Sequence, residues 1–192
     1  MRADKEELVM RKNGSWNGVG VSVALAAVMS VAGPAWAGVV DSPLPLLFTA
    51  KKTQHVFTVP GVIKNNNLET LFLCTSLQPV GVVFVGVEVF AAASGAPLND
   101  VSYNAALNMT GDGVESISPG ETATIATGNL VAFHEDEVID TLGPASVRNG
   151  SARIVATSKK IACSVMVADE LNDPPSSMSA LSVLSKKKQK GD

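Results

Sequence analysis

Between about residues 55 and 168, apolar residues recur at alternate positions in short runs that Gly, Pro and Asn separate. A period of two places successive side chains on opposite faces of a strand. Both faces of the valine-rich run 80–90 are apolar, so we expect a central strand that is covered on both sides. Other strand-like runs lie at 55–59, 69–76, 102–109, 115–118, 121–127, 151–158 and 161–168.

These runs predict an all-β domain. It is expected to be an antiparallel β-sandwich of about seven or eight strands, with a turn roughly every 8–12 residues. The runs on either side of Lys159 and Lys160 are the clearest hairpin. The weak run 102–109 is a candidate exposed edge that could pair with a partner chain. Residues 129–140 fit either a strand or one helical turn in a crossover. No long amphipathic helix pattern is present, which disfavours an α/β fold.

The N-terminal part has the features of an export signal. An uncharged apolar run at 19–32 follows Arg11 and Lys12 and precedes Ala-Trp-Ala at 35–37. This order predicts a signal peptide over 1–37, cleaved between Ala37 and Gly38. The alternative is an uncleaved N-terminal anchor, although the run is shorter than the about 20 apolar residues that span a bilayer. Met10 is an alternative start, because the charges before it are mixed in sign.

Beyond this signal, composition divides the chain into three parts. Residues 38–54 are Pro-rich and predict an extended lead-in, 55–169 form the sandwich, and 170–192 form a flexible basic tail. The tail starts with a Pro-Pro pair and ends in a cluster of lysines: Lys186, Lys187, Lys188 and Lys190. A solvated tail is one interpretation. The other is a short helix with Met178, Leu181 and Leu184 on one face, which would suit a membrane surface or an anionic polymer.

The two cysteines, Cys74 and Cys163, both lie in strand-like runs. An exported chain meets an oxidising environment, so we expect them to form a disulfide bond. Loop-entropy models assign roughly 4–5 kcal/mol to a bond that closes about 90 residues. The alternative is a pair of buried free thiols. A catalytic cysteine is disfavoured, because an inward mid-strand thiol has neither access nor a basic neighbour.

Charge and residue usage exclude several classes of function. The chain has a net charge of −3, and its lysines concentrate at the C-terminal end, so the body is acidic and a nucleic-acid partner is not expected. There are only two histidines and no Gly-x-Ser-x-Gly or Gly-rich phosphate motif. The few aromatic residues lie mostly in apolar strand patterns, which disfavours sugar or single-strand binding. A hydrolase that uses scattered carboxylates stays open.

The acidic cluster between residues 134 and 140 is a candidate metal site. Oxygen ligands suit a hard cation such as calcium, but the spacing matches no EF-hand loop, and a solvated loop is the simpler interpretation. The segment 110–115, Thr-Gly-Asp-Gly-Val-Glu, is a hairpin loop by the same reasoning, with calcium again as the alternative. The candidate ligands of the first site, the acidic cluster, are His134, Glu135, Asp136, Glu137 and Asp140.

Two stretches of the chain are VGVEVFAAASGAPLND at 85–100 and ISPGETATIAT at 117–127. Together they resemble the immunoglobulin-like and fibronectin-type-III-like β-sandwich modules of secreted bacterial proteins. The resemblance extends over 56–168 and rests on turn chemistry. It implies a fold class and no activity. The chain departs from antibody domains because no tryptophan remains after residue 37 and Cys163 lies in the last predicted strand of the sandwich.

These observations together predict an exported, non-enzymatic β-sandwich in the bacterial periplasm or at the cell surface, without a transmembrane span once the signal is removed. Its expected role is contact with a protein or another cell-envelope partner, and no cofactor is expected. The alternative is a small periplasmic metal- or ligand-binding protein that uses the acidic loop from His134 to Asp140.

Overall fold

The computed structural model describes residues 38–39, 42–48, 52–65, 67–128, 135–142, 147–169 and 171–185. Within these ranges the chain forms ten strands and one short 3-10 helix. In chain order they are β1 (Gln54–Lys64), β2 (Leu68–Ser76), β3 (Val83–Phe90), β4 (Val114–Ile117), β5 (Thr122–Ala126), β6 (Glu137–Val138), η1 (Asp140–Leu142), β7 (Val147–Ala156), β8 (Ile161–Asp169), β9 (Met178–Ala180) and β10 (Leu184–Ser185).

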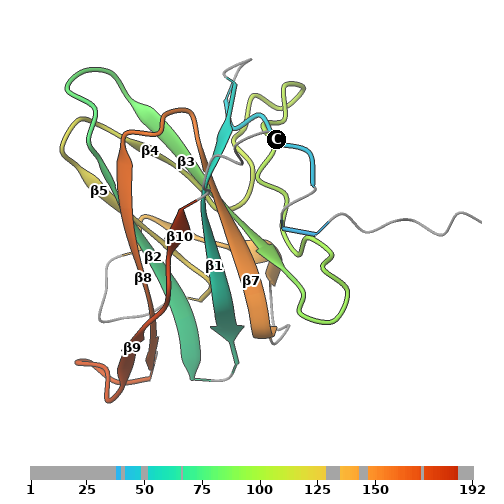
Figure 1. Cartoon of the computed structure of the whole chain (residues 1–192), viewed down its shortest axis with the longest axis vertical. Helices are drawn as coiled ribbons and strands as arrows, with labels where there is room; N and C mark the ends of the chain where they lie inside the picture. Colours follow the sequence, from blue (N-terminus) through green and yellow to red (C-terminus); the bar gives the residue numbers. More distant parts are fainter. Residues whose placement is uncertain are drawn as a thin grey trace, which may run out of the picture. The chain divides into compact units, whose positions relative to one another are not determined.

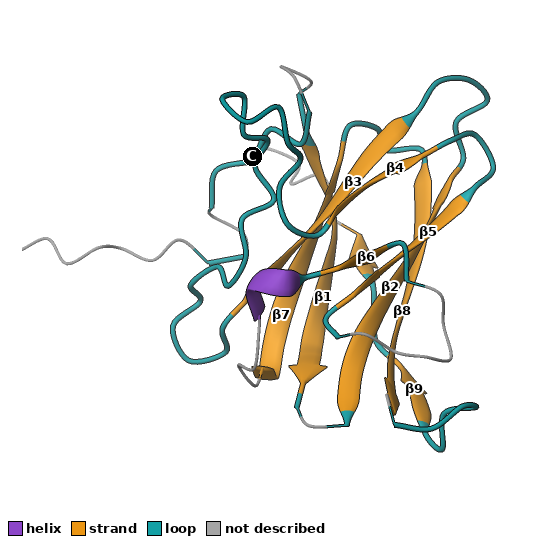
Figure 2. Ribbon diagram, turned by 180° about the vertical axis from the view of Figure 1, so that it is seen from behind, coloured by secondary structure: helices purple, strands orange, loops and turns teal. Residues whose placement is uncertain are grey.

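The strands make two five-stranded sheets (Figure 1). The first sheet has the order β10-β1-β7-β3-β4, and the second has the order β6-β5-β2-β8-β9. All neighbours are antiparallel except β5 and β6, which are parallel. Figure 2 shows β6 beside β5, followed by the 3-10 helix in purple. The predicted all-β, sandwich-like class is confirmed. Of the ambiguous residues 129–140, residues 129–134 lie outside the described ranges, and the remainder contains the short strand β6 and the first residue of the 3-10 helix η1.

The chain repeatedly crosses from one sheet to the other. The expected hairpin on either side of Lys159 and Lys160 is therefore wrong in its pairing. β7 pairs with β1 and β3 in the first sheet, whereas β8 pairs with β2 and β9 in the second. Alternation predicts which face of a strand is buried, but it does not say which strand supplies the hydrogen-bond partners.

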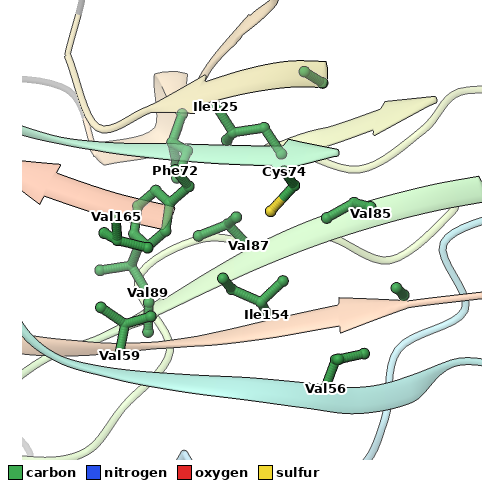
Figure 3. Close-up of a cluster of buried hydrophobic side chains, with 14 of the residues drawn as sticks. Val56, Val59, Phe72, Cys74, Val85, Val87, Val89, Ile125, Ile154 and Val165 are labelled. Carbon is green, nitrogen blue, oxygen red and sulfur yellow. The ribbon is translucent and has the colours of Figure 1, made fainter. Parts of the chain in front are cut away.

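The main core lies between the inner faces of the two sheets (Figure 3). In Figure 3, Val85 and Val87 of β3 lie opposite Phe72 and Cys74 of β2. These four side chains are fully buried. The alternating pattern of β3 produces this arrangement directly, because every second residue faces the opposing sheet.

A second, smaller apolar cluster covers the outer face of the first sheet. Val155 of β7 and the half-buried Phe84 of β3 contact Leu47 and Val101, which come from residues outside the strands. The stretch that precedes β1 thus packs on the sheet although it forms no strand. The prediction that β3 would be covered on both faces is confirmed.

The run 102–109 is not a strand. Only one isolated bridge joins Asn104 to Met109, and the Asn104 side chain accepts hydrogen bonds from the N–H groups of Ala106 and Leu107 at 3.1 and 3.2 Å. Asn108 has a positive φ of 52°. Asparagine side chains favour such turns over a sheet ladder, which explains why the expected edge strand does not form.

Residues 178–185 form two short strands, one on each sheet: β9 pairs with β8, and β10 pairs with β1. Leu181 and Val183 between them pack against the main core. The alternative of a short helix with Met178, Leu181 and Leu184 on one face is wrong. Leu181 contacts the core while Met178 and Leu184 are exposed, because the backbone here is extended.

Candidate functional site

The two cysteines form the predicted disulfide bond. Cys74 of β2 and Cys163 of β8 face each other in register, with 4.2 Å between their Cα atoms. The bond therefore lies within the second sheet and joins two neighbouring strands. Cys74 is fully buried in the core. Both cysteines of the chain are used in this bond, so neither is available as a nucleophile.

The acidic segment at 135–142 uses its carboxylates to hold backbone groups. Asp136 accepts a hydrogen bond from the Thr124 N–H at 2.7 Å, and its own N–H donates to the Thr124 carbonyl at 2.9 Å. The Glu137 carboxylate accepts from the Gly113 N–H at 3.1 Å. The segment is thereby fastened to β5 on one side and to the loop before β4 on the other.

Two acidic motifs that are separate in the sequence meet here. The Asp140 N–H donates to the Asp112 carboxylate at 2.9 Å. Burial raises the pKa of Glu137, the negative charges of Asp112, Glu115 and Asp140 raise it further, and the Gly113 N–H opposes the rise. Residues 110–115 and 137–140 thus form one electronegative region. We call it the acidic junction, and it consists of Asp112, Glu115, Glu137 and Asp140.

The acidic junction gives no direct support to a metal site. In the described ranges, no three side chains of the His, Cys, Asp or Glu type are arranged to hold a metal ion. His134, one of the five predicted ligands, lies outside those ranges. The carboxylates of Asp136 and Glu137 accept hydrogen bonds from backbone N–H groups, and the Asp140 N–H donates to the Asp112 carboxylate. Calcium binding stays a prediction.

Sequence analysis missed a buried ion pair. Glu88 of β3 and Arg153 of β7 are paired in register on the outer face of the first sheet. The Arg153 Nε donates to the Glu88 carboxylate at 2.6 Å, and Nη2 lies 2.5 Å from the same oxygen. Each residue interrupts an otherwise apolar run, and that interruption was the available signal, because a buried charge needs a partner.

Arg153 also holds the stretch before β1. Its Nη1 donates to the Ser42 carbonyl at 2.7 Å, and its Nη2 donates to the Pro43 carbonyl at 3.0 Å. The guanidinium carbon lies 5.7 Å from the centre of the Phe90 ring. Burial raises the pKa of Glu88, and the charge and hydrogen bonds of Arg153 oppose this rise. The geometry is that of a structural anchor, since the donors of Arg153 point at protein groups.

Exposed apolar side chains concentrate in the loop between β2 and β3, which we call the apolar loop (residues 77–82). Leu77, Val80 and Val82 are 58%, 76% and 46% exposed. The Leu77 N–H donates to the Lys160 carbonyl at 2.8 Å, and the Gln78 amide donates to the Ser158 hydroxyl at 2.5 Å. The loop is thus fixed to the turn between β7 and β8, where Lys159 and Lys160 are exposed.

Comparison of the chain with family models, with curated proteins and with solved structures finds no match. The fold is therefore described from this chain alone.

The predicted terminal sites lie mostly outside the described residues. Ala37 and the lysines of the tail are outside them, whereas Gly38 is described, and its carbonyl accepts hydrogen bonds from the N–H and hydroxyl of Ser42 at 3.0 and 2.9 Å. The structure therefore does not bear on signal cleavage. Across the ranges that the structure describes, no helix is long and apolar enough to cross a membrane.

Proposed function

We propose that this chain is an exported, non-enzymatic β-sandwich of the immunoglobulin-like or fibronectin-type-III-like class, located in the bacterial periplasm or at the cell surface. Its role is that of a structural or macromolecular-interaction module. The two mostly antiparallel sheets and the disulfide bond support the class and the oxidising compartment. One feature departs from antibody domains, in which the disulfide joins the two sheets, since here both cysteines lie in one sheet.

The apolar loop carries the proposal. Its three apolar side chains remain in solvent within six consecutive residues, and Val80 is 76% exposed. The Leu77 N–H bonds to Lys160 and the Gln78 side chain bonds to Ser158, so the start of the loop is anchored and less ordering entropy is lost on binding. Exposed apolar groups in such a position are typical of a contact surface. The neighbouring Lys159 and Lys160 favour a protein or cell-envelope partner with acidic groups near an apolar surface.

Native mass spectrometry of the non-reduced chain, purified from the cells that export it, tests this proposal. We expect a disulfide-bonded chain that begins at Gly38 and carries a partner or a second copy. The double variant Leu77→Ser/Val80→Ser should lose this partner. The matched control is Leu107→Ser/Met109→Ser, which removes two apolar side chains that are 65% and 59% exposed elsewhere.

Two outcomes would contradict the proposal. If the Leu77→Ser/Val80→Ser chain keeps its partner as well as the control does, the apolar loop is not the contact surface. If the wild-type chain is a monomer with one stoichiometric metal ion, the metal-binding alternative, which uses the acidic loop from His134 to Asp140, takes precedence.

A further inference from the structure

The side of the sandwich between β1 and β8 is closed by a segment with few backbone pairings. β1 pairs with β7 over most of its length, but with β10 only at Phe57 and Thr58. β8 pairs with β2 throughout, but with β9 only at residues 166–168. Figure 1 shows β10, in dark red, between β8 and β1, and β9 beside the lower end of β8. We call residues 178–185 the closing segment, and the edges of β1 and β8 with which it pairs the seam.

The closing segment completes the core from this side. Leu181 and Val183 pack against the main core, and the Leu181 N–H donates to the Val165 carbonyl at 2.8 Å. Met178 and Leu184, in contrast, are exposed. The closing segment is therefore held on the seam by two inward apolar side chains and by its short pairings with β8 and β1. All these contacts depend on the sequence of the closing segment and of the seam, and none depends on how the two are connected.

The connection from β8 to β9 is ordered by one carboxylate. Asp169, the last residue of β8, accepts hydrogen bonds from the Leu171 N–H at 3.0 Å and from the side chains of Asn172 and Ser176. The Ser176 hydroxyl, the Leu171 N–H and the Asn172 amide lower the pKa of Asp169. These bonds hold the chain in the turn that directs the closing segment back onto its own seam.

We propose that the seam accepts the closing segment of a second copy of this chain, so that two copies exchange residues 178–185 reciprocally. Exchange keeps every contact of Leu181, Val183, β9 and β10, because the second copy has the same segment. Fully extended, the eight residues 170–177 span roughly 26–29 Å, which limits how far apart the two seams can lie. The Asp169 hydrogen bonds favour the closed single chain. This site is distinct from the apolar loop and does not rest on the proposed function.

Disulfide trapping between two differently marked full-length chains tests the exchange. Thr58 and Leu184 are directly opposed in the β1–β10 ladder. A Thr58→Cys chain mixed with a Leu184→Cys chain should give a cross-linked heterodimer after oxidation, because only exchange places these positions together. The yield should rise with protein concentration between about 0.1 and 1 mM, since a short tether gives an effective concentration on the order of millimolar. Asp169→Ala in both chains should raise the yield further at each concentration.

Two controls make the result decisive. The Thr58→Cys chain mixed with a Met109→Cys chain measures random collision, because Met109 is equally accessible but lies outside the seam. The Thr58→Cys/Leu184→Cys double variant should form an internal bond at low concentration, which shows that the two positions can react. A heterodimer yield equal to the collision control, in the presence of that internal bond, would overturn the proposal. Failure of the internal bond would overturn it as well, because the closing segment would then not occupy the seam.

Discussion

At the scale of single residues, the buried Glu88–Arg153 pair is the most consequential interaction. Each charge is removed from water, and each is stabilised by the other, with the Ser42 and Pro43 carbonyls as additional acceptors. A buried ion pair adds little net stability relative to apolar residues of the same size, but loss of one partner leaves an uncompensated charge. The pair therefore matters less as a source of stability than as a constraint on what can replace it.

Arg153→Met is expected to lower the free energy of unfolding by about 3–5 kcal/mol, because it leaves the Glu88 carboxylate buried without its cation. Guanidinium denaturation at pH 7 measures this loss. The double variant Glu88→Leu/Arg153→Met should recover most of the stability, since no charge remains buried. A single variant as stable as the wild-type chain would contradict this account of the pair.

Glu137 makes the pH dependence of stability testable at one residue. Its pKa in the folded chain is raised above the ordinary value of 4.5, so the folded state binds this proton more tightly than the unfolded state does. The stabilisation of the folded state by this proton is fully present at a pH below the ordinary pKa. It is lost as the pH rises through the raised pKa of Glu137 in the folded chain. At neutral pH the ionised Glu137 is therefore unfavourable, because it is partly buried next to three other carboxylates.

Glu137→Gln should accordingly stabilise the chain relative to wild type at pH 7, and the gain should shrink as the pH falls toward 4. Glutamine keeps an oxygen to accept the Gly113 N–H, so the hydrogen bond is retained. Thermal unfolding of both chains from pH 4 to pH 7 measures the difference. In high salt the part due to Asp112, Glu115 and Asp140 should weaken, because salt screens these charges. A difference independent of pH would contradict the raised pKa.

At the scale of elements, the alternation of apolar and polar residues predicted β2 to β5 and β8 close to their observed positions. β1 continues five residues beyond its predicted end, through Pro60 and Gly61, and β7 begins four residues before its predicted start. It could not predict their partners, as the separation of β7 from β8 demonstrates. β9 and β10 have three and two residues, too few for a periodic signal, and they form only because Leu181 and Val183 reach the core. In 102–109 the turn preference of Asn104 and Asn108 outweighed a weak strand pattern.

The β2–β8 pair is the element on which the disulfide bond acts. Reduction of the wild-type chain is expected to lower the free energy of unfolding by about 4–5 kcal/mol, because the unfolded chain regains the freedom of a long loop. Guanidinium denaturation with and without reductant measures this difference without any substitution, so no cavity is introduced at the buried Cys74. Equal midpoints for the two forms would show that the bond does not contribute in this way.

At the scale of the whole sandwich, sequence predicted the composition of the candidate site but not its geometry. Asp136, Glu137 and Asp140 were visible as an acidic cluster, yet their bonds to Thr124, Gly113 and Asp112 depend on contacts between segments remote in sequence. No local pattern records such contacts. The same reason explains why the contact of Arg153 with Ser42 and Pro43 could not be predicted.

The sheets end on short strands: β4 and β10 flank the first sheet, and β6 and β9 flank the second. None of these four has more than four residues. Short edges offer few backbone groups to other chains and thereby limit indiscriminate association. In this molecule, the closing segment of the chain itself supplies two of these short edges, β9 and β10.

The bond between Cys74 and Cys163 also determines how the chain would transmit tension. A pull applied between β1 and β10 passes through the sulfur bridge and bypasses the intervening chain, because the two cysteines are 89 positions apart in sequence. While the bond is intact, only the stretches outside it can be drawn out. The oxidised sandwich can therefore lengthen under load only by these outer stretches, and reduction would add the loop between the two cysteines to the length that can be drawn out.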